Sequence, residues 1–278
     1  MDGKKLGFFG AGSMAQALIK GILGALTFPP EGIYVTNKNN EERLRFIEKN
    51  FSVRTTRDHQ ALLKECDVII IAVKPRDINE LLCNIKNYIT RDHLVISVVA
   101  GVTTSMIEKL VGKNIKVIRA MPNTSCQVKE SATAIATGRY AKPEDEEEAF
   151  RIFSSVGKVV KVDEQWMDAV TALSGSGPAY VYLMIESLTE AGVKAGLPNE
   201  IALNLSIQTV FGAAKMVVET GEMPENLRKK VMSPGGTTVA AIETLKKMGF
   251  GDSIIQAVKN AAHRSKELMK ERENYNGN

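Results

Sequence analysis

Lys5-Leu6-Gly7-Phe8-Phe9-Gly10-Ala11-Gly12-Ser13-Met14-Ala15 is a short apolar run that breaks into the pattern G-x-G-x-x-A. Apolar residues then recur at near-helical spacing over residues 17–23. A strand, a glycine turn and a helix in this order are typical of a dinucleotide-binding site. Gly10 permits the tight reversal, Gly12 lets the backbone approach a pyrophosphate, and the helix N-terminus offers free N–H groups. The pattern predicts that the cofactor is bound by Gly10, Ala11, Gly12, Ser13 and Met14; a strand-to-helix turn without a ligand is the alternative.

Strand and helix signals alternate through the first half of the chain. Strands are predicted at 5–9, 32–35, 67–73, 94–99, 116–120, 132–136 and 159–162, and helices at 14–26, 40–50, 104–111 and 143–157. Residues 67–73 show no polar alternation, as expected of a parallel strand that helices cover on both faces. We therefore expect residues 1–163 to form an α/β, Rossmann-type doubly wound sheet that binds NAD(P).

The character of the sequence changes after residue 163, because only helical patterns follow. Helices are predicted at 179–192, 199–220, 237–247 and 252–271, separated by glycine- and proline-containing breaks. The helix at 199–220 carries apolar residues around much of its circumference, which is more than one face of a small monomer buries. Residues 164–278 are thus expected to form an all-α domain that joins two copies of the chain in a dimer.

Composition narrows the class of protein. The 278 residues include 36 Lys and Arg against 32 Asp and Glu, a net charge of +4 without a long basic block, so no nucleic-acid partner is predicted. No uninterrupted apolar run reaches 18 residues and a strand begins within a few residues of the start, so we expect a cytoplasmic protein without a membrane span. Cys66, Cys83 and Cys126 lack paired spacing, and neither a disulfide framework nor a metal site is predicted.

The end of the second predicted strand bears on the choice of nicotinamide cofactor. NAD-binding folds place a carboxylate there for the ribose 2′-hydroxyl, but this chain has Thr36, Asn37 and Lys38 followed by Arg43. Lys38 and Arg43 suit a 2′-phosphate, so NADPH is predicted to be preferred, with NADH possible. The alternative is that both cations are solvated charges leading into a surface helix.

Further cofactor contacts are expected where other parallel strands end, because ligands of such sheets bind beyond the carboxyl ends of the strands. Three segments follow strands at that edge and could contact the cofactor, namely residues 72–75, 99–101 and 121–123. The small Ala100 and Gly101 suit close approach of a ring. The residues predicted to line the ribose and nicotinamide are Ala72, Val73, Lys74, Pro75, Ala100 and Gly101.

The chain resembles the pyrroline-5-carboxylate reductase family at several motifs in order. They are residues 10–15, 72–75, 100–103, Arg119-Ala120-Met121-Pro122-Asn123-Thr124, Ser174-Gly175-Ser176-Gly177-Pro178-Ala179-Tyr180 and Ser233-Pro234-Gly235-Gly236-Thr237-Thr238. The resemblance implies reduction of 1-pyrroline-5-carboxylate to L-proline by NAD(P)H, the last step of proline biosynthesis. It also implies a homodimer through the helical domain that assembles into a larger homo-oligomer.

The resemblance further implies a substrate site. The backbone of the Ser233–Thr238 segment and the N-terminus of the following helix would hold the substrate carboxylate, and Thr238 would contact the ring nitrogen as the catalytic residue. Read without the family, the same segment is a helix cap with a Pro-Gly turn. The substrate-binding residues implied are Glu164, Ser233, Gly235, Gly236, Thr237 and Thr238.

Two other functions are compatible with parts of the sequence. A 3-hydroxyacid dehydrogenase shares the glycine turn but needs a lysine acid/base, for which Lys194 is the candidate. A non-catalytic paralogue would bind the dinucleotide only, although retention of residues 233–238 argues against it. Reduction of a protonated imine yields a neutral amine, so no dedicated acid is expected. His59, His93 and His263 are predicted to lie in a loop, in a loop before a strand and in a solvated terminal helix, and they are assigned no catalytic role.

Overall fold

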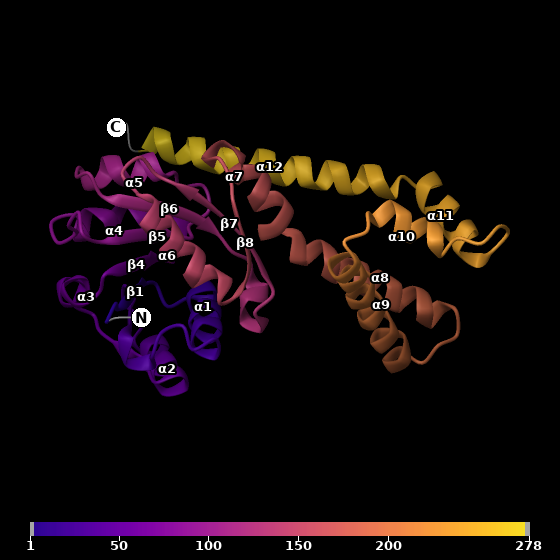
Figure 1. Ribbon diagram of the computed structural model, residues 1–278, viewed down its shortest axis with the longest axis horizontal. Coiled ribbons are helices and arrows are strands. Elements are labelled where there is room, and N and C mark those ends of the chain that lie inside the picture. Colours follow the sequence, from indigo (N-terminus) through magenta and orange to yellow (C-terminus); the bar gives the residue numbers. More distant parts are fainter. Residues whose placement is uncertain (1–2, 276–278) are drawn as a thin grey trace. The chain divides into compact units, whose positions relative to one another are not determined.

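The computed structural model describes residues 3–275, which form two compact units. The first unit comprises the residues up to Ser176 together with those from Ala261 onward, and the second runs from Gly177 to Asn260. Figure 1 shows the strands in the first unit and a group of helices in the second.

One eight-stranded sheet organises the first unit, in the order β3-β2-β1-β4-β5-β6-β7-β8. All neighbouring strands pair in parallel except β6 and β7, which are antiparallel. The strands are β1 (Leu6–Phe9), β2 (Ile33–Thr36), β3 (Arg54–Thr55), β4 (Val68–Ile71), β5 (Leu94–Ser97), β6 (Lys116–Met121), β7 (Ser131–Thr137) and β8 (Gly157–Lys161). The doubly wound sheet predicted from the alternating signals is confirmed.

Helices cover both faces of this sheet, and each face has its own apolar core. Leu6 and Phe8 of β1 belong to one core, whereas Phe9 belongs to the other, because successive side chains of a strand point to opposite faces. The α-helices of this part are α1 (Ser13–Gly24), α2 (Glu41–Phe51), α3 (His59–Glu65), α4 (Ile78–Ile85), α5 (Thr104–Val111), α6 (Pro143–Ser154) and α7 (Met167–Val170). The connecting 3₁₀ turns are η1 (Pro30–Gly32), η2 (Pro75–Asp77), η3 (Thr124–Val128) and η4 (Glu164–Trp166), and η5 (Thr171–Gly175) is π-helical.

α3, α4 and β3 are among the short elements that were absent from the sequence prediction. Asp58 caps α3 by accepting hydrogen bonds from two backbone N–H groups, so His59 opens a helix and does not lie in a loop. α4 buries Ile78, Leu81, Leu82 and Ile85, a helical spacing that was present in the sequence. β3 is only two residues long, which is too short to show a periodic pattern.

The second unit consists of helices, as predicted for this part of the chain. They are α8 (Gly177–Lys194), α9 (Asn199–Thr220), α10 (Pro224–Lys230), α11 (Thr237–Lys247) and the first part of α12 (Phe250–Tyr275). α8 and α9 lie side by side (Figure 1). α9 buries only Ala202 and Ser206 and leaves Phe211 and Val218 58% and 68% exposed.

α9 is the helix that bears on the expected absence of a membrane span. Within residues 3–275 it is the one helix that is long and apolar enough, by length and composition alone, to cross a membrane. The sequence prediction looked for an uninterrupted apolar run, and Asn204 and Gln208 interrupt the apolar residues of α9 without making its average composition polar.

The division by packing also differs from the boundary expected after residue 163. Met167 of α7 is fully buried with Met121, Ala134 and Ala136, so the segment after residue 163 packs on the strands of the first unit. The hydroxyl of Ser265 on α12 donates to the carboxylate of Asp168 at 2.6 Å. The last part of α12 therefore packs on the first unit.

Candidate active site

The glycine turn after β1 is built by the ends of two neighbouring strands. The N–H of Gly10 donates to the Thr36 carbonyl at 2.8 Å, and the N–H of Ala72 donates to the Phe9 carbonyl at 2.8 Å. Gly10 has φ +114°, and a Cβ there would lie 2.4 Å from the carbonyl oxygen of Ala72, so only glycine fits. At Gly12 a Cβ would meet no atom within 4 Å.

The N-terminus of α1 is exposed to ligand at this turn. Gly12 is its N-cap, and no side chain caps the first N–H groups of the helix. The uncapped N–H groups and the helix dipole favour an anion, and the open space at Gly12 gives it room. A hollow of about 340 Å³ lies here, lined by Ala11, Gly12, Ser13, Asn37, Asn40 and Arg43.

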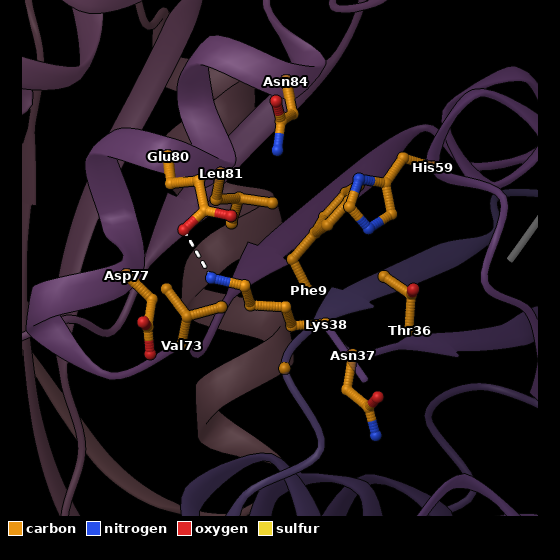
Figure 2. A pocket seen from close by; sticks show the side chains of 11 residues that line it. Phe9, Thr36, Asn37, Lys38, His59, Val73, Asp77, Glu80, Leu81 and Asn84 are labelled. Atoms are coloured by element: carbon orange, nitrogen blue, oxygen red, sulfur yellow. Dashed lines mark hydrogen bonds and ion pairs between the residues drawn. The ribbon is translucent and has the colours of Figure 1, made fainter. Parts of the chain in front are cut away.

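A deeper cavity of about 270 Å³ continues from the turn along the edge of the sheet (Figure 2). Its wall combines the ends of β1 and β2 with α3 and α4, and it is lined by Phe9, Gly10, Thr36, Asn37, Lys38, His59, Val73, Asp77, Glu80, Leu81 and Asn84. Thr36 is 1% exposed, and its hydroxyl oxygen has no hydrogen-bond partner among the described residues. An unpartnered buried hydroxyl on a cavity wall fits a polar ligand such as a nucleotide.

A third space of about 450 Å³ shares lining residues with both the hollow at the glycine turn and the deeper cavity. It is lined by Gly10, Ala11, Gly12, Asn37, Lys38, Asn39, Asn40, Ala72, Val73, Lys74, Arg76 and Asp77. The glycine turn, the end of β2 and the segment after β4 thus line one space at the carboxyl ends of the strands.

The two cations expected to hold a 2′-phosphate have different surroundings. Lys38 Nζ lies 2.5 Å from Glu80 Oε2, and this hydrogen bond raises the pKa of Lys38. Arg43 Nε donates to the Ala11 carbonyl at 2.6 Å, and its Nη2 donates to Gln16. Lys38 therefore faces the deeper cavity, whereas Arg43 also ties α2 to the glycine turn.

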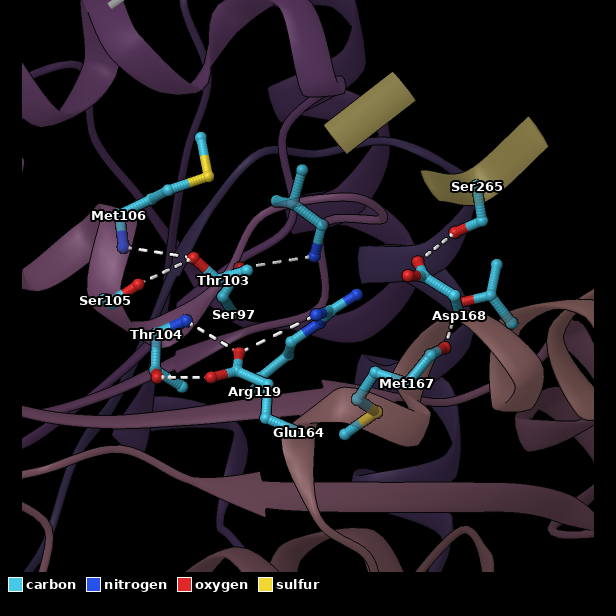
Figure 3. A network of polar contacts seen from close by, with 12 residues as sticks. Ser97, Thr103, Thr104, Ser105, Met106, Arg119, Glu164, Met167, Asp168 and Ser265 are labelled. Atoms are coloured by element: carbon cyan, nitrogen blue, oxygen red, sulfur yellow. Dashed lines mark hydrogen bonds and ion pairs between the residues drawn. The ribbon is translucent and has the colours of Figure 1, made fainter. Parts of the chain in front are cut away.

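Glu164 belongs to a second polar cluster in the first unit (Figure 3). Its carboxylate accepts from the N–H and the hydroxyl of Thr104 at 2.8 and 2.7 Å, at the N-terminus of α5. Arg119 Nη1 lies 3.6 Å from Glu164 Oε1. Arg119 is 2% exposed, and burial lowers its pKa while the carboxylates of Glu164 and Asp168 act in the opposite direction.

The Ser233–Thr238 segment lies in the second unit and forms a turn that leads into α11. Gly235 has φ +71°, and the N–H of Gly236 donates to the Ser233 carbonyl at 3.0 Å. Gly236 is the N-cap of α11, and no side chain caps the first turn of that helix. The segment therefore leaves backbone donors and a positive helix end available to a carboxylate.

Comparisons with known proteins agree with this geometry. Residues 164–268 match the family model for pyrroline-5-carboxylate reductase dimerisation, and residues 5–101 match that for NADP oxidoreductase, coenzyme F420-dependent. Pyrroline-5-carboxylate reductase 1 of Bacillus subtilis is 43% identical over 97% of this chain and 91% of its own length. The chain belongs to the pyrroline-5-carboxylate reductase family. The reductase of Methanosarcina acetivorans is likewise 43% identical, over 97% of this chain and its own full length.

Solved structures of the family extend the match to three dimensions. The Plasmodium falciparum pyrroline carboxylate reductase, solved with NADP bound, has a TM-score of 0.88 and 35% identity over 97% of this chain and 99% of its own. The Coxiella burnetii pyrroline-5-carboxylate reductase has a TM-score of 0.89 and 38% identity over 96% and 99% of the two chains. The fold and family implied by the motifs are confirmed.

Most of the predicted cofactor residues line the cavities, but not all of them do. Those that line a cavity are Gly10, Ala11, Gly12, Ser13, Thr36, Asn37, Lys38, Ala72, Val73 and Lys74. Met14, Pro75, Ala100 and Gly101 line none of these three cavities. Gly101 is buried, and Ala100 is half-buried.

Several polar residues at these sites escaped the sequence prediction. Asp77 at the end of η2 and Glu80 in the first turn of α4 line the deeper cavity, and the apolar spacing of α4 was the signal that could have located this helix. Asn123 was predicted to lie at this edge of the sheet, but its side-chain contact was not predicted: Nδ2 donates to the Ser174 carbonyl at 3.0 Å, which joins two of the family motifs. Arg119 was part of a motif, but nothing in the sequence indicated that its side chain is buried beside Glu164.

The candidate for a different dehydrogenase chemistry has an ordinary structural role. Lys194 Nζ lies 2.6 Å from Glu190 Oε1, one turn earlier in α8, and its side chain is 74% exposed. Such an exposed pair is typical of a helix surface. Among residues 3–275, no group of three or more His, Cys, Asp or Glu side chains is arranged to hold a metal ion.

Proposed function

We propose that this chain transfers a hydride from NADPH to the imine carbon of 1-pyrroline-5-carboxylate and releases L-proline. The observation that carries the proposal is the glycine turn that opens on cavities lined by Lys38, in a chain that shares 43% identity with a reductase of this name over nearly its full length. NADH is proposed as a second, weaker hydride donor.

The first unit is proposed to bind the dinucleotide. The open space at Gly12 and the uncapped N-terminus of α1 suit a pyrophosphate, with Gly10, Ala11, Ser13 and Met14 in the same turn. Thr36, Asn37 and Lys38 suit the adenosine half, because they line the deeper cavity. The nicotinamide half is assigned to the segments after β4 and β5, namely Ala72, Val73, Lys74, Pro75, Ala100 and Gly101. The bound cofactor supplies the hydride.

The segment in the second unit is proposed to hold the substrate. Ser233, Gly235, Gly236 and Thr237 form the turn and first residue of α11, and its uncapped N–H groups suit the substrate carboxylate. Thr238 is proposed to place its hydroxyl on the ring nitrogen, and Glu164 to act near the same substrate. Reduction of the protonated imine gives a neutral amine, so orientation contributes most to the rate and no dedicated acid is needed.

Residues 164–278 are proposed as the substrate-binding and dimerisation domain of a cytoplasmic enzyme. The exposed apolar side chains of α9 support an interface between two copies of the chain, since such a surface is costly in water. Assembly of dimers into a larger homo-oligomer is the further proposal. Light scattering of the purified protein tests both, and a monomer at micromolar concentration would refute them.

The activity is tested with purified protein, 1-pyrroline-5-carboxylate and either NADPH or NADH. Cofactor oxidation is followed by absorbance, and the product is identified as L-proline. We expect turnover with both cofactors and higher kcat/KM with NADPH. Cofactor binding without turnover of the imine would instead support a non-catalytic paralogue.

A further inference from the structure

The deeper cavity contains two carboxylates beside Lys38, which a site for a 2′-phosphate would not be expected to have. Lys38 is the cation that was expected to select NADPH, but its ammonium is held 2.5 Å from the carboxylate of Glu80 on α4. Asp77 lines the same cavity, and its carboxylate also acts on Lys38. Figure 2 shows the side chains of Lys38 and Glu80 meeting across the cavity, with Asp77 beside them.

Of the two carboxylates near Lys38, Glu80 is the one that contacts it directly. Asp77 has its own cation, since Arg76 Nε lies 4.0 Å from Asp77 Oδ2. Arg43 donates to the Ala11 carbonyl and to Gln16, so it is already engaged on another side of the turn. Of the charged side chains that line the deeper cavity, Lys38 and Glu80 are the pair in direct contact.

Glu80 supplies, from α4, a carboxylate like the one that NAD-binding folds place at the end of the second strand. NAD-binding folds supply a carboxylate from the end of the second strand to accept a hydrogen bond from the ribose 2′-hydroxyl. Here the end of β2 offers Asn37 and Lys38, and the carboxylate comes from α4 instead. Such a carboxylate accepts a bond from a hydroxyl but repels a phosphate.

We propose that Glu80 sets the balance between NADPH and NADH by competing with the 2′-phosphate for Lys38 and by accepting a hydrogen bond from an unphosphorylated ribose. The inference rests on the dinucleotide binding proposed above. An anion in hydrogen-bond contact with Lys38 Nζ lies within about 5 Å of the Glu80 carboxylate while the pair stays closed. At that separation in water, repulsion of a phosphate dianion weakens binding by about tenfold.

The test compares binding of NADP⁺ and NAD⁺ to the full-length protein by isothermal titration calorimetry. Glu80→Gln removes the charge and keeps the side chain's size. We expect its Kd for NADP⁺ to fall about tenfold and its Kd for NAD⁺ to rise several-fold, with both changes shrinking in 1 M NaCl because the two side chains are exposed. The fragments 2′,5′-ADP and 5′-AMP should show the same opposite changes, because the effect lies at the ribose.

A matched control distinguishes a local effect from a general loss of negative charge. Glu267→Gln removes an equivalent exposed carboxylate, paired with Arg264 on α12 and absent from the cavity linings, and should leave the affinity ratio unchanged. An unchanged ratio in Glu80→Gln, or an equal change in Glu267→Gln, would overturn the role of Glu80. Failure of the unsubstituted protein to bind either nucleotide would instead remove the dinucleotide proposal on which the inference rests.

Discussion

Alanine substitutions at Gly10 and Gly12 should separate folding from cofactor binding within one turn. Gly12 has φ −75° and ψ −173°, which any residue adopts, and a Cβ there meets no atom within 4 Å. Alanine reduces the freedom of the unfolded chain but is a poorer N-cap than glycine, and the two effects oppose each other. We expect Gly12→Ala to change the free energy of unfolding by less than about 1 kcal/mol.

The same substitution should weaken cofactor binding. The added methyl group would project into the space that we assign to the pyrophosphate, and the first N–H groups of α1 would no longer be reached at hydrogen-bond distance. A loss of affinity for NADP⁺ of tenfold or more, or about 1.4 kcal/mol, is expected.

Gly10→Ala should behave in the opposite way. Its φ of +114° disfavours alanine, and the Cβ would lie 2.4 Å from the Ala72 carbonyl oxygen and 3.0 Å from the Val73 nitrogen. Backbone strain and overpacking together predict a loss of about 2–6 kcal/mol in the free energy of unfolding. Much of a typical domain's stability would be lost.

Guanidinium denaturation and calorimetric titration with NADP⁺ measure the two effects separately. If Gly12→Ala unfolds as easily as Gly10→Ala, the reasoning from local space at the turn is wrong. If Gly12→Ala folds normally and binds NADP⁺ as tightly as the unsubstituted protein, the pyrophosphate does not approach Gly12.

Three further predictions concern other parts of the chain. Glu164→Gln leaves the buried Arg119 guanidinium without its ion-pair partner and should cost about 2–4 kcal/mol in denaturant unfolding, whereas adding Arg119→Met should recover part of the loss; no recovery would show that the charge pair is not the cause. Thr238→Ala should lower kcat/KM, with a loss of transition-state stabilisation of about 1–3 kcal/mol, and should leave the affinity for NADP⁺ unchanged. An unchanged kcat/KM would exclude the hydroxyl contact. Burial raises the pKa of Cys66 from 9.0 to about 12, so the folded state disfavours the thiolate and stability should fall as pH rises from 9 towards 12, by at most about 4 kcal/mol. Cys66→Ala should flatten this alkaline loss in denaturation midpoints measured from pH 8 to 11, and an equally steep loss in the variant would contradict the assignment.

Much of the fold could be predicted from the sequence because many strands, turns and helices depend on residues that are close together in the chain. The glycine turn after β1 requires a positive φ at Gly10, and the apolar run of β4 requires cover on both faces; each shows directly in neighbouring residues. α3 and α4 were missed, although the capping Asp58 and the apolar spacing of α4 were both present in the sequence. β3 spans two residues and carries no periodic signal.

The candidate site was predicted less completely, because side-chain contacts join residues that are distant along the chain. Lys38 was predicted to accept a 2′-phosphate, but the sequence did not indicate that α4 brings Glu80, 42 positions away, into contact with it. Arg119 meets Glu164 only when η4 packs beside α5, and Ser265 reaches Asp168 across 97 positions. No spacing rule reports such pairs, because they depend on how elements pack.

By itself, the sequence determined the alternating strands and helices, the dinucleotide turn, the helical second region and the family motifs. These features depend on φ preferences, apolar periodicity and residue types that act within a few positions of one another. Only the tertiary structure decided which charges line the deeper cavity and which carboxylate lies beside the buried Arg119. The reason is physical: the charge of a site is the sum over side chains that packing brings together, and packing joins segments that the sequence keeps apart.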